Sequence, residues 1–461
     1  MATLEPATMP HARHGHYIAG PIGSFQVPED FRSIEKAGWT FAAHPVLPII
    51  EVGNTVVIGH AIDADNPVSP ASNPNRRFNW GGRWVAFDFD AGYAEGGATM
   101  MMPMSFRPSD GVVSSNPYLL STNLNHRLVE ITGHPNSDGY YPLGFTPFLD
   151  VEEVLPNHGL NLSTLETFRL RGHPGHGHHT YSETVRKVAT NTNLHIRGIK
   201  KLGPAVLALT AGNDSRFVLA CSRGIEDLTA FSMVSPKIDP IEAKIAGQIA
   251  KIAGIPWESV QVQESTEAER KQFFEMVGYT ISGGLAYCWR TVSDYMPKTT
   301  ILNGLGGENF RYVYQKPEDD PDRKITAEEV LKRMRLAIIP EYISRMEKYI
   351  HELERDDLHS VLSMSFAEIR LGGWANYQNT LGRQAPNLAP MLSQENLMLM
   401  HQIQWEDRIG KSFLVETCKD AWPELLSVPV NTYTGLRGKL YKMQKLGKRA
   451  GKKISRILGS K

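Results

Sequence analysis

The stretch AVLALTAGNDSRFVLA, residues 205–220, organises this chain. Its first five residues, Ala205 to Leu209, form a short and wholly apolar run, which is typical of a strand covered on both faces in a parallel sheet. Small residues then turn the chain at Thr210 to Gly212, and a helical pattern resumes at Asp214. Consecutive N–H groups at a helix start can bind an anion, but an Asp there can equally be an ordinary helix cap. The residues alone predict strand, turn and helix, and leave both roles of the turn open.

A second polar loop follows a later apolar run. Ile301 and Leu302 precede the segment Gly304-Leu305-Gly306-Gly307-Glu308-Asn309. The turn at 210–215, Thr-Ala-Gly-Asn-Asp-Ser, resembles the pyrophosphate loop Ser-Gly-Gly-x-Asp-Ser of the asparagine synthetase family and its ATP pyrophosphatase relatives, with conservative changes at the first two positions. The segment 304–309 resembles that family's Gly-Glu-Gly-x-Asp-Glu signature, and DPIEAKIAGQIAKIAGI at 239–255 follows the second expected strand as it does in the family.

The resemblance implies a nucleotide site between the two loops. Asp214 and Glu308 would face one another and hold Mg²⁺ on the triphosphate of ATP, since carboxylate oxygen is the hard ligand that this ion prefers. Arg216 would join them as a catalytic residue. Arg216 or Arg311 would offer positive charge to phosphate, although a surface or helix-dipole role fits either arginine equally well. The residues expected to bind ATP are Thr210, Ala211, Gly212, Asn213, Asp214, Ser215, Ser232, Met233, Asn303 and Gly304.

The region from His16 to Glu183 has strand-like patterning broken by Gly and Pro. Its segments GGRWVAFDFDAG, DGVVSSNPYLLS and YYPLGFTPFLDVEEVLPNHGLNL resemble the glutamine amidotransferase domain of asparagine synthetases. The fold implied for residues 1–184 is an antiparallel β-sandwich with short or missing helices, a degenerate relative of the Ntn hydrolases. That family uses a cysteine directly after the initiator methionine, whereas this chain begins Met1-Ala2-Thr3 and has no cysteine before Cys221. Because alanine carries no nucleophile, we expect no glutamine hydrolysis by the covalent route.

Residues 185–435 alternate strand and helix patterns and then become helical. Strands are expected at 205–209, 228–233 and 260–262, with helices from about Asp239 and Glu267, which predicts a doubly wound parallel sheet with ligands beyond its carboxyl ends. Beyond Lys324 the pattern is typical of a helical lobe, which resembles the lobe that closes over the acyl substrate in the family. A family lysine that stabilises charge during adenylation is replaced here by Asn431, so either another group serves or the reaction differs.

Four histidines, at positions 173, 176, 178 and 179, lie between the two expected domains. Imidazole binds metals, but the intervening Gly and Pro residues leave no fixed geometry, and a flexible linker is favoured over a metal site. The three cysteines have no metal-type spacing and indicate buried thiols in a reducing compartment. With no signal-like or membrane-spanning run, we expect a cytoplasmic protein.

The last segment, residues 436–461, contains ten Lys or Arg and no acid. Apolar residues recur three or four apart, which predicts a basic amphipathic tail. Its composition fits adsorption to an anionic membrane surface, which would make the protein peripheral to the membrane, but a solvated or partner-docking tail is favoured over this and nucleic acid fits less well.

These patterns favour an asparagine synthetase-like, AMP-forming carbon–nitrogen ligase. It would adenylate a carboxylate with ATP and Mg²⁺, release pyrophosphate, and transfer the acyl group to ammonia or an amine. Without its own glutaminase, it would take nitrogen from ammonia, an amine substrate or a separate amidotransferase. A silent nucleotide-binding scaffold and an adenylating nucleic-acid modifier remain as alternatives.

Overall fold

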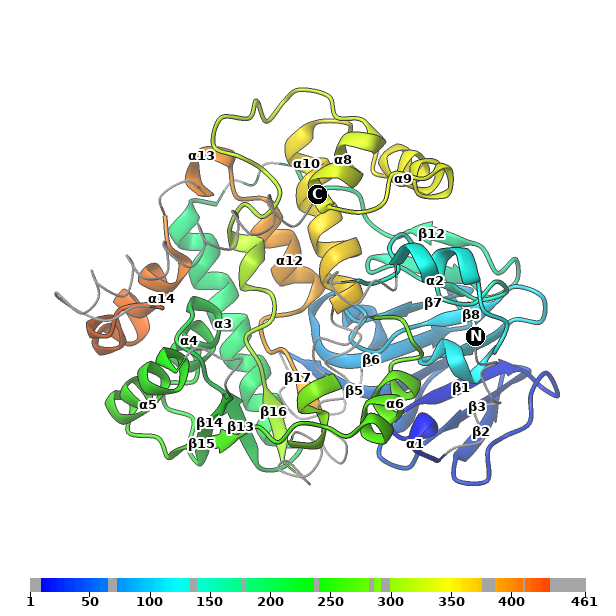
Figure 1. The fold of residues 1–461 in the computed structure, drawn as a ribbon, viewed down its shortest axis with the longest axis horizontal. Coiled ribbons are helices and arrows are strands. Elements are labelled where there is room, and N and C mark those ends of the chain that lie inside the picture. The colour runs from blue at the N-terminus through cyan, green and yellow to red at the C-terminus, as the bar shows by residue number, and fades with distance from the viewer. Residues whose placement is uncertain are drawn as a thin grey trace, which may run out of the picture.

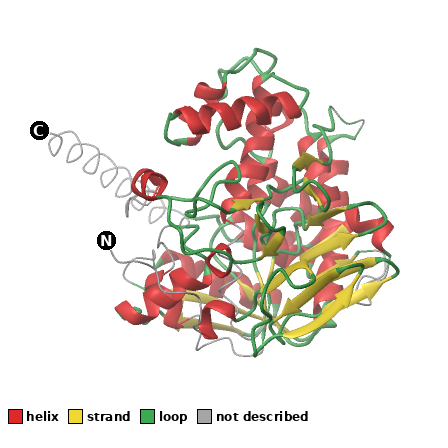
Figure 2. Cartoon of the chain, turned by 90° about the vertical axis from the view of Figure 1, so that its right-hand side faces the viewer, coloured by secondary structure: helices red, strands yellow, loops and turns green. Residues whose placement is uncertain are grey.

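The computed structural model describes residues 10–64, 73–132, 139–175, 177, 179–235, 240–281, 286–291, 299–374, 386–408 and 411–431. The fold is mixed α/β, with two antiparallel sheets, one parallel sheet and helices (Figures 1 and 2). The predicted tail at 436–461 lies outside the described residues. Within the described part of the chain, no helix combines the length and the apolar character needed to cross a membrane.

The N-terminal part is a β-sandwich of two six-stranded sheets. One sheet has the order β10-β8-β9-β1-β3-β2 and the other β12-β11-β7-β6-β5-β4, and every pairing in them is antiparallel. The strands are β1 (Tyr17–Pro21), β2 (Arg32–Lys36), β3 (Trp39–Ala43), β4 (Ile49–Val52), β5 (Thr55–Asp63), β6 (Trp80–Asp88), β7 (Tyr93–Gly96), β8 (Ser105–Arg107), β9 (Val112–Ser114), β10 (Glu152–Glu153), β11 (His158–Asn161) and β12 (Thr167–Arg169). This confirms the expected antiparallel sheets.

The two faces of β5 are both buried, for different reasons. Side chains alternate across a strand, so Val56 and Ile58 enter the core between the two sheets, where they join Phe41 and Phe87. The opposite face carries Val57 and packs with Trp80 and Trp84. The long helix α3 (Tyr181–Lys200) lies against this outer face.

The helices of the sandwich are short: α1 (Pro10–Arg13), α2 (His126–Thr132), and the 3₁₀ turns η1 (Pro74–Asn79) and η2 (Pro117–Leu119). The other helix, α3, begins with a capping box, in which Thr180 and Glu183 satisfy each other's backbone N–H groups. It packs on the sandwich and contributes to the core of the parallel sheet, so it joins the two parts of the molecule.

The second part is built on a five-stranded parallel sheet with the order β15-β14-β13-β16-β17. Its strands are β13 (Ala205–Ala208), β14 (Leu228–Val234), β15 (Trp257–Gln261), β16 (Thr300–Leu302) and β17 (Asn387–Leu388). The prediction of a parallel sheet with alternating helices is confirmed. The third strand begins three residues before the expected Val260, and the short β17 was not predicted.

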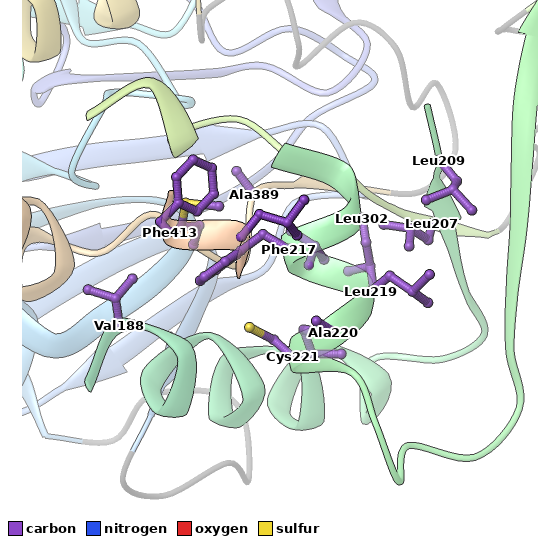
Figure 3. Packing of buried hydrophobic residues seen from close by; sticks show 14 of the residues in the cluster. Val188, Leu207, Leu209, Phe217, Leu219, Ala220, Cys221, Leu302, Ala389 and Phe413 are labelled. Carbon is purple, nitrogen blue, oxygen red and sulfur yellow. The ribbon is translucent and has the colours of Figure 1, made fainter. Parts of the chain in front are cut away.

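One face of this sheet packs against α3, α4 (Asn213–Cys221) and α5 (Ile241–Ala253). Leu207 and Leu302 of the sheet meet Phe217 and Leu219 of α4 in this core (Figure 3). The opposite face forms a smaller apolar cluster around Phe231. The helix α6 (Glu267–Met276) and the 3₁₀ turn η3 (Ala286–Cys288) follow β15.

The helical lobe has its own core and follows β16. It comprises α8 (Ala327–Met334), α9 (Pro340–Glu352), α10 (Leu358–Ser365), the π-helix η5 (Phe366–Leu371), α12 (Gln394–His401), α13 (Trp405–Arg408), α14 (Phe413–Ala421) and the 3₁₀ turn η7 (Pro423–Ser427). Leu331, Met346 and Leu362 come from three of these helices and are fully buried together. The predicted helical region is confirmed.

Polar side chains connect the sandwich to the lobe. The carboxylate of Glu368, in the π-helix η5, accepts bonds from Arg169 Nη1 (2.9 Å), Asn157 Nδ2 (2.9 Å) and the hydroxyl of Tyr349 (2.6 Å). Glu368 is fully buried, and the charge of Arg169 holds its pKa below the usual value against the effect of burial. The Glu368 carboxylate thus joins donors from the sandwich and from the lobe at one buried point.

A second polar contact joins the sandwich to α6. His16, directly before β1, lies between Ser115 Oγ (2.9 Å from Nδ1) and the carbonyl oxygen of Met276 (2.8 Å from Nε2). Asn116 Nδ2 donates to the neighbouring carbonyl of Glu275. These side chains bind carbonyl groups in the last turn of α6, where the helix supplies few N–H partners. Burial and the charge of Arg83 lower the pKa of His16 to about 3, so its imidazole is neutral.

Candidate functional site

The two predicted loops meet at the carboxyl ends of β13 and β16. These strands are direct neighbours in the sheet, with Leu207 opposite Leu302, although the chain reaches β14 and β15 between them. The strand order therefore reverses between β13 and β16, and a reversal of this kind leaves a crevice where open α/β sheets bind ligands. The loop before α4 and the loop before the 3₁₀ turn η4 (Gly307–Phe310) both open at this point.

Two glycines, Gly304 and Gly307, allow the second loop to pack directly against the first. A Cβ atom at Gly304 would lie 2.6 Å from the backbone nitrogen of Ser215, and one at Gly307 would lie 2.1 Å from Asp214 Oδ1. Both distances are shorter than any normal contact, and the first obstacle is backbone, which does not move aside. The glycines predicted as part of a signature are thus required to bring Glu308 next to Asp214.

Asp214 and Glu308 form a pair of like charges. Asp214 is the second residue of α4, and Arg311 Nη2 lies 3.2 Å from each of its carboxylate oxygens. Burial and the nearby Glu308 charge raise the pKa of Asp214 to about 7, despite the opposing effect of Arg311. The Oε2 atom of Glu308 is buried and has no hydrogen-bond partner. Two crowded carboxylates, one with an unsatisfied oxygen, are an arrangement that a divalent cation would relieve.

The loop before α4 is held by its own side chains. Ser215 Oγ accepts from Thr210 N–H (3.0 Å), and Gly212 N–H points to Thr210 Oγ1 (3.2 Å). Ala211 N–H donates to a carboxylate oxygen of Glu242, in the first turn of α5 (2.9 Å). Gly212 is the N-cap of α4 and provides no side-chain cap. The loop therefore presents an uncapped helix start that already attracts one carboxylate.

Arg216 does not face this loop as a phosphate ligand would. Its side chain is fully buried, and its guanidinium donates to the carbonyls of Leu425 (3.3 Å) and Pro429 (3.2 Å) and, with a shorter contact, to Val428. The role expected for Arg216, offering charge directly to phosphate, does not agree with this placement. A buried guanidinium that donates to several backbone carbonyls ties those backbone segments together. Arg311, by contrast, is 43% exposed and contacts Asp214.

The expected nucleotide residues beyond the first loop are placed around it. Ser232 Oγ donates to the carbonyl of Leu209 (2.7 Å) and accepts from Trp257 Nε1 (3.0 Å), so it supports the loop from β14. Asn303 Nδ2 donates to Asn387 Oδ1 (2.7 Å), and Asn303 Oδ1 accepts the N–H of Leu305 (3.0 Å). Met233 is half-buried on the cluster around Phe231. Thr210 is exposed, and Asn213 and Gly304 are half-exposed at the loop surfaces.

Asn431, which stands where the family has a lysine, lies at the first loop. Its N–H donates to the carbonyl of Ala211 (3.2 Å), and its side chain is exposed. Its φ of 52° is left-handed, a conformation that Asn adopts more readily than most residues. The backbone of Asn431 therefore contacts the loop, but its side chain carries no positive charge.

Two residues that contact the site loops, Glu242 and Arg408, were not predicted from the sequence. The sequence predicted that Glu242 lies in a helix, but the residues around it give no sign that its carboxylate reaches Ala211. Arg408, in α13, donates from Nη1 to the carbonyl of Asn309 (3.1 Å), directly after Glu308. Both contacts join residues far apart in sequence and leave no pattern in the local sequence.

The histidine segment does not form a metal site in the part of the chain that the structure describes, where no three His, Cys, Asp or Glu side chains are arranged to hold an ion. His173 is half-buried, with its ring 6.2 Å from that of His359 and 6.1 Å from that of His401. His176 and His178 lie outside the described residues. Asp214 and Glu308 supply two carboxylates, which suffices for Mg²⁺ because that ion keeps waters and substrate phosphates as its other ligands.

Comparison with known proteins adds little. No protein-family model matches the sequence, and no curated protein matches it. Among solved structures, a glutamine-dependent NAD⁺ synthetase from Acinetobacter baumannii in complex with ADP is similar with a TM-score of 0.19 and 14% identity. The match covers 47% of this chain and 40% of that chain, so this chain spans less than half of the synthetase. A TM-score this low does not define a shared fold.

Proposed function

We propose that this protein is an ATP-dependent, AMP-forming ligase that joins a carboxylate to ammonia or an amine. The proposal rests on one observation: Asp214 and Glu308 are crowded together at the strand reversal, beside the start of α4, and Asp214 has a pKa of about 7. Paired carboxylates beside an anion-attracting helix start suit a nucleotide triphosphate with its Mg²⁺. The sequence resemblance of both loops to the asparagine synthetase family supports the same chemistry.

The residues of this chain would divide the work. Asp214 and Glu308 would hold Mg²⁺, which offsets phosphate charge when bound. The helix start at Asn213 to Ser215 would bind the leaving pyrophosphate. An oxygen of the substrate carboxylate would attack the α-phosphorus of ATP, and the bond from that phosphorus to the bridging oxygen would break, releasing pyrophosphate. The amine nitrogen would then attack the acyl carbon, lose a proton and release AMP.

Nitrogen would reach the site without glutamine hydrolysis by this chain. The sandwich begins its first strand at Tyr17, and the preceding residue is the neutral, buried His16 and not a cysteine. The nitrogen donor would therefore be ammonia, an amine substrate, or ammonia from a separate amidotransferase.

ATP–pyrophosphate exchange tests this proposal directly. Wild-type protein with Mg²⁺, ATP and a panel of carboxylic acids should return radiolabel from pyrophosphate to ATP with at least one acid. Asp214→Ala and Glu308→Ala should abolish exchange and leave the circular dichroism spectrum unchanged, because each substitution removes one of two crowded like charges and no apolar core residue. Glu258→Ala, on the exposed edge of β15, is the matched control and should keep full activity. Full exchange in both loop variants would remove the metal assignment.

A nucleotide-binding scaffold without catalysis is the second candidate. It is favoured by two contacts that fill the site from within the chain: Glu242 on the Ala211 N–H and Arg311 on Asp214. Tight Mg·ATP binding with no exchange on any acid would support the scaffold over the ligase.

A further inference from the structure

Three arginines of the described chain are buried without a carboxylate partner. Arg83 is 5% exposed, Arg216 is fully buried and Arg408 is 6% exposed, and each donates to backbone carbonyls. Burial lowers the pKa of each to about 10, so all three remain charged at neutral pH. A buried charge that is not paired with an opposite charge is expensive, so such residues are expected where they serve a purpose.

Arg216 connects the first site loop to the C-terminal turn. In addition to the three carbonyls between Leu425 and Pro429, its Nη2 atom lies 3.5 Å from the carbonyl oxygen of Ala211. The same oxygen accepts the N–H of Asn431 (3.2 Å). In a trans peptide the carbonyl and the following N–H point in opposite directions. Drawing the Ala211 carbonyl back toward Arg216 therefore fixes the direction of the Gly212 N–H.

Arg408 holds the second loop in the same way. Its Nη1 atom donates to the carbonyl of Asn309 (3.1 Å) and its Nη2 atom to the carbonyl of Met400 at the end of α12 (2.7 Å). Asn309 directly follows Glu308, so this bond limits how far the Glu308 backbone can move. Within the described residues no carboxylate bonds Arg408, and burial together with the Arg408 charge lowers the pKa of the neighbouring His401.

An aromatic cluster lies between the two arginine contacts. Phe217 follows Arg216 in α4, Phe310 follows Asn309, and Phe413 of α14 packs on both, with ring centroids 5.4 Å and 4.8 Å away. Figure 3 shows Phe217 and Phe413 packed side by side in this core. The two loops thus share one rigid support on the side away from the site.

We propose that Arg216 and Arg408 are a pair of positioning residues that hold the two site loops from behind and place uncompensated positive charge beneath an anion-binding crevice. Neither residue contacts the site opening. A guanidinium suits this task because it has five donors in one plane and cannot lose its proton near neutral pH, whereas lysine offers a single point charge. The consequence for nucleotide affinity rests on the proposed function, but the positioning of the loops does not.

The experiment compares the two arginines with Arg83, which is equally buried but supports Gly15 in the sandwich. Arg216→Met, Arg408→Met and the control Arg83→Met each remove one buried guanidinium. Amide hydrogen exchange of peptides covering 210–217 and 304–310 reports the loops without any ligand. We expect exchange in 210–217 to be about tenfold faster or more in Arg216→Met, and in 304–310 for Arg408→Met, with both peptides unchanged in Arg83→Met.

Binding of Mg·ADP, measured by calorimetry, is the second readout. The affinity should fall about tenfold or more in Arg216→Met and stay within about twofold in Arg83→Met, even where both variants lose similar thermal stability. If a methionine variant does not fold, Arg216→Lys and Arg408→Lys replace it, and they should show intermediate exchange because they keep the charge and lose donors.

Equal loop exchange in Arg216→Met, Arg408→Met and Arg83→Met would overturn the proposal. Loss of exchange protection throughout the molecule in all three variants would do the same, since it would show general destabilisation. If wild-type protein fails to bind Mg·ADP while the loop-specific exchange is observed, the proposed function is wrong and the positioning role stands.

Discussion

The substitution Glu308→Gln tests the charge pairing at the site. It keeps the shape of the side chain and removes its charge. The pKa of Asp214 stands at about 7 against an ordinary value of 3.8, through burial and Glu308 together. That difference corresponds to about 4 kcal/mol disfavouring the Asp214 anion. With Glu308 neutral and Arg311 still in place, the pKa of Asp214 should fall.

The pH dependence of Mg·ADP binding makes this measurable. Mg²⁺ must displace the proton of Asp214, so wild-type affinity at pH 6 should be about tenfold below its plateau above pH 8, with a midpoint near 7. In Glu308→Gln the midpoint should move to lower pH, and the plateau affinity should fall about tenfold or more because one carboxylate ligand is lost. Calorimetry from pH 5.5 to 8.5 gives both quantities, and Glu258→Gln is the control.

Stability without metal gives an independent measure. An acid whose pKa is raised by folding binds its proton more tightly in the folded state, so its stabilisation is present at low pH and is lost as pH rises from 3.8 through about 7. This contribution should lower the free energy of unfolding by up to about 1.4 kcal/mol per pH unit over that range, and by less in Glu308→Gln. A binding midpoint that stays near 7 in the variant would refute the pairing.

Further outcomes are expected elsewhere in the chain. Purified protein should release no glutamate from glutamine, because His16 and not a cysteine precedes the first strand of the sandwich, and steady release by a preparation free of amidotransferases would contradict this. As pH falls from 6.5 to 3, the free energy of unfolding should fall by up to about 1.4 kcal/mol per pH unit on account of His16, whose pKa is lowered to about 3 in the folded state. Urea titrations at several pH values should show that the free energy of unfolding depends less steeply on pH in His16→Gln. Glu368→Gln should cost about 3–5 kcal/mol in the same titrations, since it leaves Arg169 buried without its counter-charge; a loss below about 1 kcal/mol would argue against the network. Full-length protein should sediment with anionic and not neutral liposomes, unlike a chain ending at Tyr433; equal recovery of both forms in the supernatant would exclude a membrane role for the tail.

The central sheet and the two site loops were predictable because their signals are local. An apolar run, a turn of small residues and a helical pattern fall within sixteen consecutive residues at 205–220. The meeting of Asp214 and Glu308 followed from the resemblance, and the glycines at 304 and 307 explain how it occurs.

The surroundings of the site were not predictable in the same way. Arg216 sits in a helix beside the loop, so proximity in sequence suggested a phosphate ligand. Its partners are carbonyls more than 200 residues later, between Leu425 and Pro429. Whether a guanidinium points forward to a ligand or back to a distant turn depends on tertiary packing, which local patterns do not encode.

The π-helix η5 makes the connection between sandwich and lobe sensitive to the length of the chain. A π-turn takes up more residues than an α-turn, because its hydrogen bonds span five residues and not four. Deleting one residue between Phe366 and Leu371 would allow an ordinary α-turn and would leave the flanking residues close to their present places, because the π-turn takes up about one residue more than an α-turn. Glu368 lies inside this turn, so its side chain would be displaced around the axis and could no longer face Arg169. Homologues that share the Arg169–Glu368 pair should therefore also keep the number of residues in this segment, even where its sequence has diverged.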